Sequence, residues 1–136
     1  MILDELVIEN FGVYGGCQAV TLTPVDTDHP ITIVGGLNGR GKTTILDAIQ
    51  LALYGNRARV SNREGLPYEA YIRRARFRGA EPSANCSVTL SFSIVDTAGT
   101  VCYQIRRSWS APERPFKEKL EVFRDGRRDR ALSETW

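Results

Sequence analysis

The sequence has few of the residues that build metal or redox sites. Its 136 residues include one histidine, His29, and three cysteines, Cys17, Cys86 and Cys102, with no C-x-x-C pair. An odd number of widely spaced cysteines beside a single histidine does not supply the ligand set of a structural zinc site. We therefore expect buried or inert thiols, and a solvated loop residue at His29 rather than a catalytic base.

Long apolar runs are also missing. No run approaches the roughly 20 residues that a membrane-spanning helix needs. The N-terminus, MILDELVIEN, has acids where a secretory signal carries basic residues. The sequence thus predicts a cytoplasmic protein with no membrane partner. Its apolar content of 42% and charged content of 25% are typical of one folded domain.

Strong net charge is absent too, because the formal value is only +2. This excludes a chain that is basic throughout, as many nucleic-acid binders are. Positive charge is nevertheless concentrated between residues 57 and 78, where only Glu64 and Glu69 oppose seven arginines. A solvated surface and a phosphate-binding surface both fit this pattern. The arginines are residues 57, 59, 63, 73, 74, 76 and 78.

Alternating and helical patterns predict an α/β fold. Helical spacing of Ile45, Leu46, Ile49 and Leu53 predicts a helix over 42–54, ended by a glycine at position 55. Period-two patterns predict antiparallel hairpins, and a β-branched run predicts one buried strand before the helix. The expected elements are strands at 2–9 and 17–23, a buried strand at 31–34, a short helix near 66–74, a hairpin over 86–107 and an extended segment near 119–126.

The stretch VGGLNGRGKTT, residues 34–44, carries the chemistry that is most specific. Gly36, four residues, then Gly41, Lys42 and Thr43 match the phosphate-loop pattern G-x-x-x-x-G-K-[ST]. Glycines let successive N–H groups curl around a phosphate, and the helix that follows points its positive end at the same anion. Lys42 is expected to reach the β and γ phosphates as the catalytic cation, and Thr43 to place its hydroxyl on Mg²⁺.

A second stretch, Asp96 to Gly99, reads DTAG and is found in small GTPases after their phosphate loop. A guanine site usually needs N-K-x-D as well, and this tetrapeptide does not occur in the sequence. The alternating segment VCYQIRR follows, so a hairpin turn is the favoured interpretation. The same argument disfavours Asp96 as the acid that would bind the magnesium ion.

The region around the phosphate loop resembles the SMC-like ATPases, the ABC-type family that includes cohesin and condensin subunits. Their pattern N-G-x-G-K-[ST]-[ST]-[LI]-[LI]-[DE]-A-[IL] fits Asn38 to Ile49 throughout, and residues 6–16 resemble their first strand. Within the family, the likeness is greatest to the DndD ATPases of bacterial DNA phosphorothioation, also called DNA sulfur modification. The motif and the resemblance together assign nucleotide contacts to Gly36, Asn38, Gly39, Arg40, Gly41, Lys42, Thr43 and Thr44.

The resemblance implies ATP and Mg²⁺ as cofactors, an antiparallel β subdomain packed on a strand, phosphate loop and helix core, and ATP held between two heads of a homodimer. DNA and other phosphorothioation proteins are the implied partners. The family's distal signature motif and coiled coil are not found, so we expect residues 1–136 to be the N-terminal half of a head, with ATP hydrolysis very slow or absent. Relatives in DNA break repair often have Arg-Ser where Gly12 and Val13 stand, so the nucleotide contact of that arginine cannot be transferred. By position, Phe77 to Gly79 is a candidate for the adenine site.

Three alternatives remain open at this stage. The first is the head of an SMC-like protein in DNA repair. The second is a small GTPase-like switch. The third is a DNA-binding module whose loop grips backbone phosphate, with the arginines of 57–78 as its main surface; it predicts salt-sensitive DNA binding without nucleotide.

Overall fold

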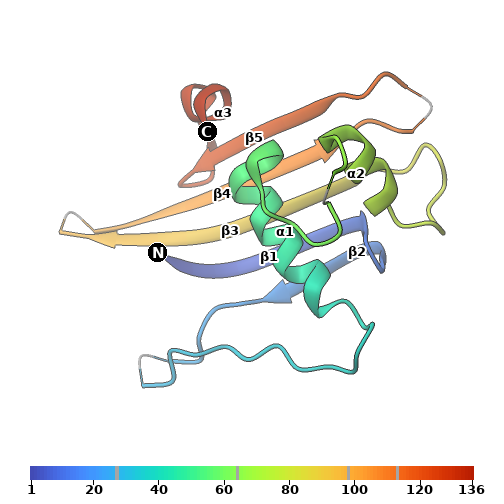
Figure 1. Cartoon of the computed structure of the whole chain (residues 1–136). Coiled ribbons are helices and arrows are strands. Elements are labelled where there is room, and N and C mark those ends of the chain that lie inside the picture. Colours follow the sequence, from blue (N-terminus) through green and yellow to red (C-terminus); the bar gives the residue numbers. More distant parts are fainter. Residues whose placement is uncertain (27, 64, 98, 113) are drawn as a thin grey trace.

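A six-stranded antiparallel sheet in the order β2-β1-β3-β4-β5-β6 forms the body of the molecule (Figure 1). The computed structural model describes residues 1–26, 28–63, 65–97, 99–112 and 114–136. The strands are β1 Ile2–Phe11, β2 Tyr14–Thr21, β3 Cys86–Asp96, β4 Gly99–Trp109, β5 Glu118–Arg124 and β6 Arg127–Arg128. Both expected hairpins are confirmed, and so is the extended segment near 119–126.

Helix α1, Lys42–Tyr54, lies across one face of this sheet (Figure 1). Its bounds agree with the expected helix, and Gly55 follows as its C-cap. The short helix expected near 66–74 is α2, Tyr68–Ala75. A 3₁₀ turn, η1 Gly55–Arg57, and a short helix, α3 Arg130–Thr135, complete the set. In the described residues, no helix is long and apolar enough to cross a membrane.

The core lies between the sheet and α1. Leu6, Leu90, Ile105 and Val122 stand side by side on four neighbouring strands, and all are fully buried. Helix α1 adds Ile45, Ala48, Leu51 and Ala52 to the same core. The expected apolar stripe was wrong at Leu46, which is 63% exposed, because the buried face of the helix runs through Ala48 and Leu51 instead.

The buried strand expected at residues 31–34 does not form. Residues 31–37 have no regular structure, and Ile31 and Ile33 are 78% and 85% exposed. A β-branched run becomes a strand only beside another strand that shares its hydrogen bonds, and no strand of the described residues pairs with it. Residues 31–40, all exposed, therefore form an arm that leads to α1; we call it the exposed arm.

The cysteines divide into a buried thiol and two exposed thiols. Cys86 is buried in β3, and burial raises the pKa of its thiol to about 12. Cys17 and Cys102 are exposed on β2 and β4. His29 is exposed in a loop, where its Nδ1 lies 2.8 Å from Asp26 Oδ1.

Candidate functional site

The candidate site begins at the N-terminus of α1, which has no cap. Gly41 precedes the helix with φ of 97°, in the left-handed region, and its carbonyl accepts the first helical bond from the Ile45 N–H at 3.1 Å. No side chain caps this end, and the first turn holds no acid. Within the described part of the chain, the N–H groups of Lys42, Thr43 and Thr44 have no partner, so they and the helix dipole are free for an anion.

Lys42 folds back over the loop that precedes it. Its Nζ donates to the Gly36 carbonyl at 2.6 Å and to the Leu37 carbonyl at 2.9 Å. The first glycine of the motif, Gly36, and its lysine are thereby brought together. The ammonium group and the free N–H groups therefore belong to the same turn of chain, a combination that is favourable to a bound anion.

The other predicted contacts lie at different places on the loop. Asn38 and Gly39 form an exposed turn, in which Gly39 has φ of 78° and the Arg40 N–H donates to the Leu37 carbonyl at 3.3 Å. Thr43 is exposed at the start of α1, and Thr44 is half-buried behind it. The structure thus brings Gly36, Gly41, Lys42, Thr43 and Thr44 together, whereas Asn38 and Arg40 lie out on the exposed arm.

The exposed hydroxyl of Thr43 fits one ligand position of a magnesium ion. Mg²⁺ commonly takes few protein ligands and completes its shell with water and substrate phosphates. Among the described residues, no group of three or more His, Cys, Asp or Glu side chains could hold a metal.

The turn between β1 and β2 reaches the start of α1, which the sequence did not reveal. A Cβ on Gly12 would overlap Thr44 Cγ2, and one on Gly41 would lie 2.7 Å from Tyr14 Oη. The Tyr14 hydroxyl also donates to the Gly41 carbonyl at 3.3 Å. Gly12 therefore stands where any larger residue would displace the helix. The repeated glycines of FGVYGG were the signal, but they do not say which segment approaches them.

The seven arginines do not form one surface. Arg63, Arg73 and Arg76 donate to backbone carbonyls, so they hold loops in place. Arg73 also pairs with Glu69, and Arg63 lies 5.2 Å from the Tyr68 ring. The exposed arginines with no partner among the described residues are 57, 59, 74 and 78.

The structure also locates the DTAG stretch and the region of Phe77, the candidate for the adenine site. Asp96 pairs with Gly99 at the β3–β4 turn, which Figure 1 shows at the end of the sheet away from the start of α1. The hairpin interpretation of DTAG is thus confirmed for its described residues; Ala98 lies outside them. The ring of Phe77 packs against the backbone of Gly15 and Gly79, so it supports the β1–β2 turn.

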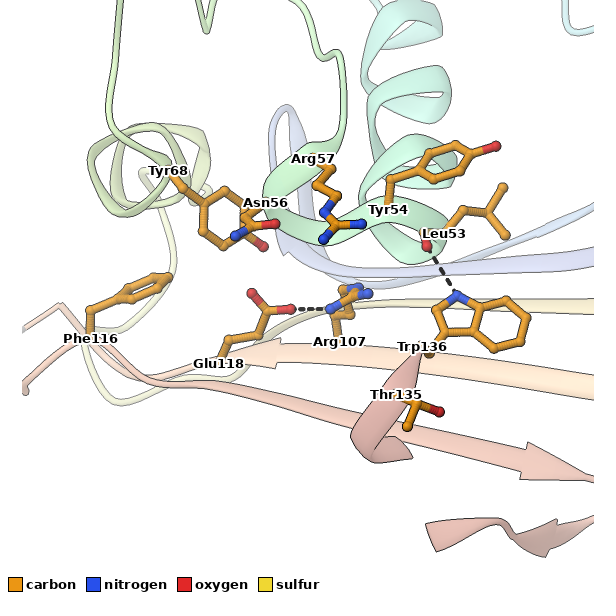
Figure 2. A pocket seen from close by; sticks show the side chains of 10 residues that line it. All are labelled: Leu53, Tyr54, Asn56, Arg57, Tyr68, Arg107, Phe116, Glu118, Thr135 and Trp136. Atoms are coloured by element: carbon orange, nitrogen blue, oxygen red, sulfur yellow. Dashed lines mark hydrogen bonds and ion pairs between the residues drawn. The ribbon is translucent and has the colours of Figure 1, made fainter. Parts of the chain in front are cut away.

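A cavity of about 520 Å³ lies at the other end of α1 (Figure 2). Its floor holds Arg107, which is 6% exposed, pairs with Glu118 and donates from Nε to the Ala52 carbonyl at 3.1 Å. Burial, with the nearby Glu118 charge, raises the pKa of Tyr68. The Trp136 Nε1 donates to the Leu53 carbonyl at 3.0 Å. These side chains pair with one another or with backbone carbonyls of α1. We therefore interpret this region as a structural contact between α1 and the sheet rather than as a second site.

Comparison with known proteins identifies the family of the chain. The profile of the family described as AAA domain (AAA_23) matches residues 5–134. The chain belongs to this family. It is also similar to a subunit of the nuclease SbcCD from Treponema pallidum (strain Nichols), at 36% identity over 108 residues, which cover 76% of this chain and 9% of the relative.

The same SbcCD subunit from Vibrio cholerae serotype O1 is 39% identical over 51 residues, or 38% of this chain and 5% of that protein. These matches place the chain among SMC-like ATPase heads, which confirms the coarser part of the sequence resemblance. The chain spans less than a tenth of the length of these curated relatives.

The Arg107 contact can be tested through stability. Replacing Arg107 by Ala leaves Glu118 without its partner in a half-buried position, so we expect the free energy of unfolding to fall by about 3 kcal/mol or more. The neighbouring Arg106 is a matched control, because it is 43% exposed and meets Glu9 only at 3.8 Å. Arg106→Ala is expected to cost less than about 1 kcal/mol. Urea unfolding of both variants checks this, and equal losses would contradict it.

Proposed function

We propose that this chain is the ATP- and Mg²⁺-binding N-terminal part of an SMC-like ATPase. The observation that carries the proposal is the uncapped start of α1, where Lys42 and three free N–H groups converge on the turn that Gly36 and Gly41 define. In this proposal Lys42 contacts the β and γ phosphates and Thr43 contacts the magnesium ion. Thr44, one residue further along α1, offers its N–H to the same phosphates.

Adenine is the base that the proposal favours. The family match is to an ATPase domain, and N-K-x-D, which guanine sites usually carry, is absent from the sequence. Asp96 and Gly99 of DTAG pair at the end of the sheet away from the start of α1 (Figure 1). The small GTPase-like switch is therefore the weaker alternative.

The proposal includes a catalytic site completed by other polypeptide segments. In this proposal the residues that position the attacking water belong to those other segments, because phosphoryl transfer depends on such positioning. The arm and α1 also expose large apolar side chains, which include Ile31, Ile33, Leu37 and Leu46. Such a surface suits contact with protein. We assign that contact to the C-terminal half of the head, with a second head closing on the nucleotide.

For the biological role, we propose DNA phosphorothioation, with DNA and other proteins of that system as partners. Support comes from the likeness of residues 1–55 and of FRDGRRDRALSETW to the DndD branch. A role in DNA repair is the second candidate, and the similarity to two proteins named for the SbcCD nuclease favours it about as well. Exposed arginines 57, 59, 74 and 78 are available for DNA phosphates in either role.

Nucleotide binding can be tested directly by calorimetry. Lys42→Ala removes the cation that folds over the phosphate turn, and we expect the affinity for MgATP to fall at least about tenfold, since hydrogen bonds to charged groups are worth roughly 1.5–3 kcal/mol. Lys117→Ala, which removes an exposed lysine outside the site, is the matched control. Equal affinity of the wild type and Lys42→Ala would overturn the proposal.

The two biological roles can be separated in cells that carry the natural gene. If the phosphorothioation role is correct, the Lys42→Ala allele lowers or abolishes phosphorothioate linkages in genomic DNA, measured by mass spectrometry of digested DNA. If the repair role is correct, those linkages are unchanged or never present, and the allele instead sensitises cells to double-strand breaks. The control allele is again Lys117→Ala.

A further inference from the structure

We infer that Tyr14 is a positioning residue of the phosphate loop, which acts by holding the Gly41 peptide group. The inference rests on the proposed function, because it concerns how the same loop presents its N–H groups. Tyr14 begins β2 and is separated from Gly41 by 27 positions in the sequence, yet its hydroxyl donates to the Gly41 carbonyl at 3.3 Å. The phosphate-loop pattern, residues 36–43, does not include Tyr14.

Gly41 is the residue of the loop that packs against the rest of the fold. It is buried, whereas every residue of the exposed arm before it is exposed. The residues against it come from the β1–β2 turn, since an added Cβ would meet Tyr14 Oη and Val13 Cγ2, both at 2.7 Å. A glycine is therefore needed both for its positive φ and for this close approach.

Tyr14 is itself on a rigid support. Asn10, buried in β1, accepts a hydrogen bond from the Gly16 N–H and donates to the Asn85 carbonyl, both at 2.8 Å. The Gly12 N–H donates to Ala75 at the end of α2, and Phe11 stacks on Trp109 at a centroid distance of 6.0 Å. The turn is thus tied to β3, α2 and the core, and it can transmit that rigidity to the loop.

Holding the Gly41 carbonyl also orients the next N–H. A trans peptide is planar, with its C=O and its N–H on opposite sides. A bond from Tyr14 to the Gly41 oxygen consequently directs the Lys42 N–H away from the β1–β2 turn, toward the open side of the loop. Since the Ile45 N–H binds the same oxygen, Tyr14 and the first helical turn fix this peptide together. Tyr14 would therefore preorganise an N–H that contacts phosphate.

The test uses the whole chain and the variant Tyr14→Phe, which keeps the ring and removes the hydroxyl. We expect the affinity for MgATP and for inorganic tripolyphosphate to fall by the same factor, about 3- to 10-fold, since a single hydrogen bond contributes about 0.5–1.5 kcal/mol. Tyr54→Phe, at the exposed far end of α1, is the control and should leave both affinities unchanged. Circular dichroism and the melting temperature verify that the variants fold.

A second measurement does not depend on binding. In the chain without nucleotide, the amide ¹⁵N and ¹H resonances of Lys42 should move in Tyr14→Phe and stay in place in Tyr54→Phe. Unmoved Lys42 resonances, or unchanged affinity for both ligands in Tyr14→Phe, would overturn the inference. If the wild type binds neither ligand, the proposed function is wrong, whereas the amide resonances still decide whether Tyr14 holds the Gly41 peptide.

Discussion

The close approach of the β1–β2 turn to the start of α1 is the constraint on which the rest of the site depends. Two glycines make it possible: Gly12 leaves room for Thr44, and Gly41 leaves room for Tyr14 and Val13. The helix therefore begins at one fixed point on the sheet. Because its first N–H groups have no cap, that point is also where a bound anion would lie.

The C-terminal end of α1 is held by an ion pair and a hydrogen bond. There a buried arginine, Arg107, pairs with Glu118 and donates to the Ala52 carbonyl near the helix C-terminus, where a cation is favourable. The middle of the helix packs its small residues Ala48 and Ala52 on the sheet. The helix is thus fixed in three places. The exposed arm before it is held by fewer contacts, which include the bonds from Lys42 Nζ to the Gly36 and Leu37 carbonyls and one from the Thr32 hydroxyl to the Leu22 carbonyl. The rigid part of the site is thus the helix start, and the rest of the loop is open.

The sequence predicted the elements whose signals are local. The period-two pattern of β3 and the spacing of the glycines, Lys42 and the apolar residues of α1 located the hairpin and the helix correctly. The strand at 31–34 failed because a strand needs a neighbour, and a sequence pattern cannot show whether one is present. Helix α3 was missed, although Asp129, whose side chain accepts from the Leu132 N–H, is a cap that the sequence contained. Tyr14 could not be predicted, since only the tertiary fold brings it to Gly41.

The most direct test of the central claim, that this loop holds ATP as one half of a catalytic site, is a ³¹P NMR time course of MgATP with the purified chain. We predict that the β and γ resonances shift on binding and that the shift requires Lys42. Inorganic phosphate should accumulate no faster than with Lys42→Ala. Rapid phosphate release by the wild type that disappears in Lys42→Ala would contradict the account, and so would resonances that never shift.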